Sequence, residues 1–151
     1  MKHSDIRPFD YEFGGNIKGK MADVGRTLGS KTIGLVIQTM RPGCFSSRRH
    51  KHVFQEEILI VMAGEGRLHH GNESIPVSAG DCVCYLPEDA EAHNFENTGA
   101  ADLVVWAFGN RFPHEVALYP DQGLAFVEGL GADVPLDVGK RSEWTEDRRK
   151  R

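Results

Sequence analysis

The sequence lacks the features that mark membrane, secreted and nucleic-acid-binding proteins. No apolar run approaches the ~18 residues that a membrane-spanning helix needs, so we expect no such helix. Residues 1–10 are polar and contain no apolar stretch of signal-peptide length. A formal net charge of −4 offers no overall basic surface for nucleic acid. We therefore expect a cytoplasmic protein that contacts neither membranes nor nucleic acids.

Cysteine is scarce, with Cys44, Cys82 and Cys84 as the three in the chain. Cys82 and Cys84 would lie on the same face of one strand, which is a poor geometry for a disulfide between them. An odd number of cysteines without metal-type spacing is typical of a reduced, cytosolic protein.

Helical periodicity is weak throughout the sequence, and internal repeats and low-complexity segments are absent. Short runs rich in β-branched and aromatic residues are separated instead by glycine, proline and asparagine. The predicted strands lie within Thr32–Met40, Val53–Met62, Arg67–His70, Glu73–Val77, Asp81–Leu86, His93–Phe95 and Leu103–Phe108. Strands at this spacing predict an all-β sandwich or barrel.

The ends of the chain differ in composition from the central part. We predict an N-terminal arm over residues 1–30, a barrel over 31–125 and a C-terminal extension with a partly disordered tail over 126–151. Gly123–Leu130 has room for a helical turn or two, although glycines limit its length. The basic cluster Arg148–Arg151 is expected to be a solvated, frayed end of the chain.

Aromatic residues alternate in the N-terminal arm at Phe9, Tyr11 and Phe13. A period of two residues predicts a short strand, which we expect at the edge of a sheet. Because the edge strands of a single-domain barrel need to be covered, this strand favours a homodimer.

Three histidines and a glutamate carry the main chemical signal. His50 and His52 are two residues apart, which places both imidazoles on one face of a strand. Glu57 opens the next apolar run, and His93 opens another short strand further along the chain. Three neutral imidazoles and one carboxylate suit iron, manganese, nickel, cobalt, copper or zinc, and leave positions open for water or substrate. We therefore expect one divalent transition metal ion.

Two segments resemble the motifs of the cupin family. The first motif is matched by Gly43, His50-x-His52, Glu57 and Gly64, and the second by Gly80, Pro87, His93 and Asn97. The resemblance covers about Leu35–Phe108, and His114–Asp121 more loosely resembles the tail of some single-domain bacterial cupins. It implies a double-stranded β-helix (jelly-roll) barrel, usually dimeric. It also implies that His50, His52, Glu57 and His93 are the metal ligands.

The match departs from the family pattern in the lengths of its turns. Gly43 precedes His50 by one residue more than usual, and the stretch from Gly80 to Pro87 is also one residue longer than usual. Asp89 stands at the position after Pro87 that is usually glycine, and His93 then comes one position later than usual. These changes leave every ligand type in place, so they affect loop shape more than metal binding.

Glu56 competes with Glu57 for the role of the acidic ligand. We choose Glu57 because it stands at the family's distance from Gly64 and because it shares a strand face with Leu59 and Val61. The alternate residues Ile58, Ile60 and Met62 are also apolar, so we expect this strand to be buried on both faces. Phe95 is also expected to point inward, and the resulting cavity would be mostly apolar with a metal at one end.

Arg48 is a candidate substrate contact. It falls on the face of His50 if the strand is unbroken there, and its guanidinium could hold a substrate carboxylate. A solvated loop arginine beside Arg49 fits the residues equally well. The remaining histidines carry no such signal and are expected at the surface. They are His3, His69, His70 and His114.

Several functions remain open. The first is a metalloenzyme acting on a small organic molecule with oxygen donors, such as a carboxylate or a diketone, with the class of reaction unresolved. The second is a non-catalytic module that binds or senses a small molecule. The third is an epimerase-like cupin that uses a His–Asp base without metal, which the complete set of four ligands argues against.

Overall fold

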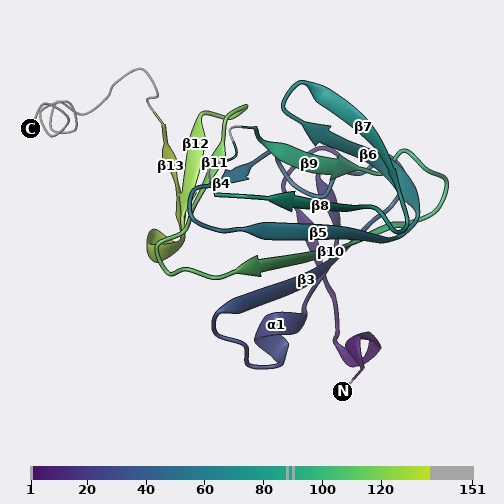
Figure 1. Cartoon of the computed structure of the whole chain (residues 1–151), viewed down its shortest axis with the longest axis horizontal. Helices are drawn as coiled ribbons and strands as arrows, with labels where there is room; N and C mark the ends of the chain where they lie inside the picture. Colours follow the sequence, from purple (N-terminus) through teal and green to yellow (C-terminus); the bar gives the residue numbers. More distant parts are fainter. Residues whose placement is uncertain (1, 88, 90, 137–151) are drawn as a thin grey trace, which may run out of the picture.

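The computed structural model describes residues 2–87, 89 and 91–136, and its regular structure is almost entirely β-strand (Figure 1). The strands are β1 (Phe9–Glu12), β2 (Lys18–Asp23), β3 (Ile33–Met40), β4 (Lys51–His52), β5 (Glu57–Ala63), β6 (Glu65–His70), β7 (Glu73–Ser78), β8 (Cys82–Tyr85), β9 (His93–Glu96), β10 (Leu103–Asn110), β11 (Val116–Tyr119), β12 (Leu124–Val127) and β13 (Ala132–Pro135). The helical elements are α1 (Val24–Thr27) and the 3-10 turns η1 (His3–Asp5) and η2 (Glu128–Leu130). The prediction of an all-β fold is confirmed.

Three antiparallel sheets enclose the interior. The largest has six strands in the order β1-β2-β3-β10-β5-β8, and the smallest, β7-β6-β9, lies above β8, β5 and β10 in Figure 1. The third, β13-β12-β11-β4, lies at one end of these two sheets. An antiparallel bridge between His50 and His93 connects the chain just before β4 to the start of β9. The barrel therefore closes at the position of two predicted ligands.

The core lies between the facing sheets and follows the period-two pattern of the strands. Leu59 and Val61 of β5 and Leu103 and Val105 of β10 are between 0 and 5% exposed. The same cluster includes Met40, Cys44, Leu68, Tyr85 and Phe95. Because alternate residues of a strand share a face, Glu57 points into the same interior as Leu59.

The outer face of the six-stranded sheet is apolar but only partly covered. The expectation that β5 is buried on both faces is wrong for the single chain, since Ile58 is 43% and Met62 is 46% exposed. The covering layer from the N-terminal part of the chain packs over β3 instead. This small cluster consists of Ile6, Ala22 and Val24 against Leu35 and Ile37.

The N-terminal strand is confirmed as an edge strand, because β1 is the outermost strand of its sheet and pairs with β2. Its neighbour β2 is not predicted from the sequence, because lysines and glycine obscure any apolar alternation there. The predicted helical turns over Gly123–Leu130 are mostly wrong: β12 pairs with both β11 and β13. Only η2 is helical, and it ends at Gly131, which has a left-handed φ of 60°.

The basic cluster at the C-terminus lies outside the described residues. No helix of the described part of the chain is long and apolar enough to cross a membrane.

Candidate metal centre

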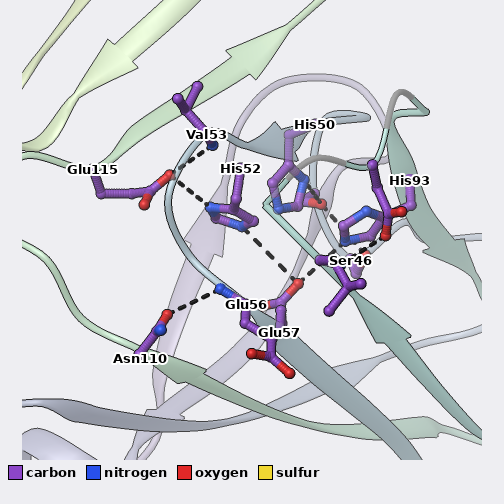
Figure 2. Close-up of polar contacts among 12 residues, drawn as sticks. Ser46, His50, His52, Val53, Glu56, Glu57, His93, Asn110 and Glu115 are labelled. Carbon is purple, nitrogen blue, oxygen red and sulfur yellow. Dashed lines mark hydrogen bonds and ion pairs between the residues drawn. The ribbon is translucent and has the colours of Figure 1, made fainter.

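Residues from three separate strands converge at one end of the barrel interior (Figure 2). One ligand atom from each of His50, His52 and Glu57 lies within 4.8 Å of the others. His93 joins them through Glu57, since its Nε2 lies 3.2 Å from Glu57 Oε2. The structure therefore brings together the four residues predicted as metal ligands.

Backbone pairing between strands fixes the Cα positions of these ligand residues. His50 and His93 exchange two backbone hydrogen bonds of 3.1 and 2.9 Å, and their ring centroids are 4.8 Å apart. His52 lies on β4 opposite Ala117 of β11. Glu57 is the first residue of β5 and pairs with both β8 and β10. The site therefore depends on the register of strands that are far apart in the sequence.

The imidazole of His50 is oriented by the backbone before it. Its Nδ1 lies 3.0 Å from the carbonyl oxygen of Arg48 and 3.2 Å from Ser47 Oγ. A carbonyl oxygen only accepts, so Nδ1–H donates to Arg48 and Nε2 keeps its lone pair. Burial, together with the neighbouring His93 and His52, lowers the pKa of His50 to about 3. This imidazole is therefore neutral near pH 7, as a metal ligand needs to be.

His93 is held by stacking rather than by a hydrogen bond at its second nitrogen. Its ring lies parallel to that of Tyr85, with centroids 3.7 Å apart and planes 5° apart. The side chain is 2% exposed, and its Nδ1 is buried without a hydrogen-bond partner among the described residues. Van der Waals contact with Tyr85 therefore fixes the plane in which Nε2 approaches Glu57.

The charge state of Glu57 also suits a metal. Burial by itself raises the pKa of this carboxyl, but the hydrogen bond from His93 and the nearby His52 and His50 outweigh burial and lower it. Glu57 is therefore ionised near pH 7. Three imidazoles and one carboxylate in a buried pocket fit a divalent transition ion. Glu56, the rival, is exposed and lies beside Cys84 on the outer face, at 3.8 Å from its sulfur.

Glu115, which precedes β11, is a site residue that sequence reasoning missed. Its Oε1 lies 3.4 Å from His52 Nδ1, which is longer than an ordinary hydrogen bond but close enough for an electrostatic contact. The same oxygen accepts backbone hydrogen bonds from Val53 at 3.0 Å and Phe54 at 3.4 Å. Burial raises the pKa of Glu115, yet the contact with His52 and these N–H groups lower it overall. No local motif indicates this role, because it arises from the pairing of β4 with β11.

A cavity of about 290 Å³ adjoins the candidate ligands. Leu59 and Phe95 supply apolar wall, as expected from alternation. The prediction of a mostly apolar cavity is wrong, however, because polar and charged side chains form much of the remaining wall. They include Asp23, Arg26, Gln38, Gln55 and Arg111. For most of these residues, the sequence pattern does not indicate that the side chain points into the barrel.

Arg48 lies outside this cavity. Residues 46–49 are bends rather than a strand, so the alternation that would carry Arg48 to the face of His50 is broken. Its guanidinium is 3.2 Å from Asp133 and lies over the ring of Tyr119, 5.6 Å from the centroid. These residues line a separate depression. A substrate contact by Arg48 stays a prediction.

The other histidines are not part of the cluster of candidate ligands, although His70 of β6 pairs with His93 of β9. His69 binds Glu96 at 2.8 Å and is half-buried rather than at the surface, as is His70 beside Tyr85. His3 contacts Trp106, and His114 contacts Phe54. Each therefore has a packing role within the described residues.

The comparison with protein families identifies the barrel. Residues 36–108 match the family model described as the cupin domain. The chain contains a cupin domain. The predicted resemblance and the double-stranded β-helix barrel that it implies are confirmed.

Known proteins similar to this chain have different described functions. An oxalate-binding protein of Thermotoga maritima is 43% identical over 54 residues, which are 36% of this chain and 43% of that protein. The chain thus spans less than half the length of that relative. A solved structure from Acidithiobacillus ferrooxidans, provisionally assigned as a sugar phosphate isomerase, has a TM-score of 0.82 at 26% identity. The match covers 92% of this chain and 90% of that protein's chain. A sugar phosphate isomerase of the cupin superfamily from Silicibacter pomeroyi has a TM-score of 0.75 at 25% identity, with 83% of each chain covered.

Proposed function

We propose that this protein is a cytoplasmic, mononuclear metal-binding cupin that acts on a small organic molecule with oxygen donors. The observation that carries the proposal is the convergence of three imidazoles and one ionised carboxylate at the end of a cavity. His50, His52, Glu57 and His93 would hold one divalent transition metal ion. The cavity of about 290 Å³ limits the substrate to a small molecule.

The residues of the chain would prepare this site in distinct ways. A bound divalent ion supplies a Lewis acid for a carboxylate, carbonyl or enolate oxygen. His50 keeps a lone pair on Nε2 because its Nδ1–H is engaged by the Arg48 carbonyl. Glu57 contributes negative charge that offsets part of the charge of a dication. Leu59 and Phe95 exclude water from the inner wall.

The similar proteins support a small, oxygen-rich ligand. The Thermotoga maritima relative is described as binding oxalate, and two solved neighbours are described as acting on sugar phosphates. Both kinds of ligand are anionic and offer adjacent oxygen atoms to a metal. We carry over only this shared chemistry to the present chain.

Competition with a coloured chelator tests the metal site. Untagged protein is titrated with Zn²⁺, Mn²⁺, Ni²⁺ and Fe²⁺, and we expect one tight site per chain. His52→Ala and His93→Ala should each remove most of the affinity, whereas Glu56→Ala serves as the control and should leave it unchanged. Equal affinity in wild type and both histidine variants would refute the proposed ligand set.

A non-catalytic binding module is the second candidate, and the oxalate-binding relative favours it. The two functions differ in whether the bound molecule changes. Metal-loaded protein is incubated with dicarboxylates, diketones and sugar phosphates, and the mixtures are followed by NMR. Conversion that disappears in His93→Ala supports an enzyme, while binding by calorimetry without any conversion supports the binding module.

A further inference from the structure

Two glycines leave one level of the cavity wall without side chains. Gly34 of β3 pairs with Gly109 of β10, and Gly109 pairs with Glu57 of β5, so the three form one row across the sheet. All three line the cavity. A row across three adjacent strands spans two strand spacings, or about 10 Å between its outer Cα atoms. Glu57, at one end, is the only member of the row with a side chain.

Side chains from outside the row occupy the space above these glycines. The amide of Gln55 lies where a Cβ on Gly109 would be. The guanidinium of Arg111 lies over Gly34, and a Cβ there would be 3.0 Å from Arg111 Nε. Across the cavity wall the order is therefore the Glu57 carboxylate, the Gln55 amide and the Arg111 guanidinium. Arg111 lies at the end of the row away from the candidate ligands.

Arg111 is held in place, but only part of its hydrogen-bonding capacity is used by the described residues. Its Nη2 donates to Asp23 Oδ1 at 2.8 Å, and both side chains are less than a quarter exposed. Asp23 is itself fixed, because it accepts the backbone N–H of Arg26 at 2.8 Å. A guanidinium has five N–H groups, and the described residues give Arg111 this one side-chain hydrogen bond. The remaining donors are available to a ligand in the cavity that Arg111 lines.

Arg26, the second cation of the cavity wall, is less suited to bind a ligand. Its side chain is 68% exposed and lies between Asp23 at 3.3 Å and Glu128 at 3.7 Å. Two carboxylates therefore already surround it at the rim. Arg111 is the better enclosed of the two, and lower solvent exposure strengthens a charge-assisted hydrogen bond.

We propose that Arg111 binds a second anionic group of the substrate, a carboxylate or a phosphate, while the oxygen donors of the substrate bind the metal ion that Glu57 and the histidines would hold. This inference rests on the proposed metal site and defines the substrate class. The row of about 10 Å suits a molecule of three or four carbons with an acidic group at the far end. Asp23 is the positioning residue that orients the guanidinium.

Three matched ligands test the role of Arg111. Lactate, malate and 3-phosphoglycerate share one α-hydroxycarboxylate end. They differ only at the third carbon, which is a methyl group in lactate and carries a carboxylate in malate and a phosphate ester in 3-phosphoglycerate. Calorimetry on metal-loaded wild type should show malate or 3-phosphoglycerate binding about tenfold more tightly than lactate, or better. Arg111→Gln should abolish this preference and leave lactate affinity and metal content unchanged. Arg41→Gln, at an exposed position outside the cavity, is the control and should keep the preference.

A second variant moves the guanidinium without removing its charge. Gly34→Ala places a methyl group 3.0 Å from Arg111 Nε, so we expect it to reduce the preference while retaining metal and lactate binding. Thermal unfolding monitors the fold of each variant.

Two results overturn the inference: equal affinities for the three ligands in wild type, or an acidic preference that survives in Arg111→Gln. The same titrations on metal-free protein separate the two proposals. If metal never binds, the metal site fails, and an acidic preference that depends on Arg111 still supports the anionic subsite. If metal binds and the ligands bind alike, only the anionic subsite fails.

Discussion

His52 turns one ring nitrogen toward Glu57 and the other toward Glu115. Its Nε2 is 4.0 Å from Glu57 Oε2, and its Nδ1 is 3.4 Å from Glu115 Oε1 (Figure 2). A carboxylate on the far nitrogen of a metal-binding histidine fixes the tautomer and makes the other nitrogen a stronger ligand. The backbone N–H groups of Val53 and Phe54 hold Glu115 in that position.

We therefore predict that Glu115→Ala weakens metal binding by about 10- to 100-fold, which is the usual range for such outer residues. Glu115→Gln should fall between the alanine variant and wild type, because the amide oxygen still places a partial negative charge near Nδ1–H but lacks the full charge of the carboxylate. Chelator competition measures both affinities. Glu128→Gln, on the rim of the same cavity, is the control. Unchanged affinity in Glu115→Ala would show that His52 needs no such partner.

Sequence reasoning reaches some residues of the site and misses others for a physical reason. The His50-x-His52 spacing and the position of Glu57 before an apolar run are local patterns, and the structure brings these side chains together. Glu115 and Arg111 have no local pattern, because their roles depend on which strands pair and where glycines leave room. For Arg48 the pattern is misleading, since bends replace the strand that it assumes.

At the scale of elements, an ion pair joins the turn after β11 to the segment before β4. Arg49 donates to both carboxylate oxygens of Asp121, at 2.9 and 2.7 Å, and also to the carbonyl of Gly71. The hydrogen bond from Arg49 lowers the pKa of Asp121. A group whose pKa is lowered in the folded state stabilises the fold above its unfolded pKa, near 4. That stability is lost as pH falls through the folded pKa.

Asp121→Asn should therefore lower the free energy of unfolding at pH 7 by no more than about 1 kcal/mol, because the pair is partly exposed. The difference from wild type should shrink as pH falls below about 4. Urea unfolding at several pH values measures it. Asp102→Asn is the control, since the structure shows Asp102 in no ion pair within the described residues. A difference that is constant with pH would contradict the assignment.

The strands of the barrel are predicted best where glycine and proline separate apolar runs. The runs at Thr32–Met40 and Leu103–Phe108 correspond closely to β3 and β10. Prediction fails where tertiary pairing decides the outcome. Leu124–Val127 is a strand because β11 and β13 supply its hydrogen bonds on either side, a fact that no local pattern carries.

At the scale of the whole molecule, the outer face of the six-stranded sheet lacks a full covering layer. Ile58 and Met62 are each more than 40% exposed, and Phe9 on the edge strand β1 is 52% exposed. Exposed apolar surface and an open sheet edge both favour association with a second chain. The second copy offers the same apolar face, which suits a two-fold symmetric contact.

We predict a homodimer, with a mass by light scattering of about twice the 16.8 kDa of one chain. Ile58→Arg should shift the protein toward monomer, because it places a charge on the exposed apolar face. Leu130→Arg, at a position 69% exposed on η2, is the matched control and should leave the mass unchanged. A monomeric wild type at micromolar concentration would contradict the prediction.

The metal site can be tested most directly by anomalous diffraction from crystals of metal-loaded protein, collected at the absorption edge of the added metal. We predict one peak per chain, about 2.0 to 2.2 Å from nitrogen atoms of His50, His52 and His93 and an oxygen of Glu57. Absence of a peak between these residues, or a peak bound by Glu56 on the outer face, would contradict the account.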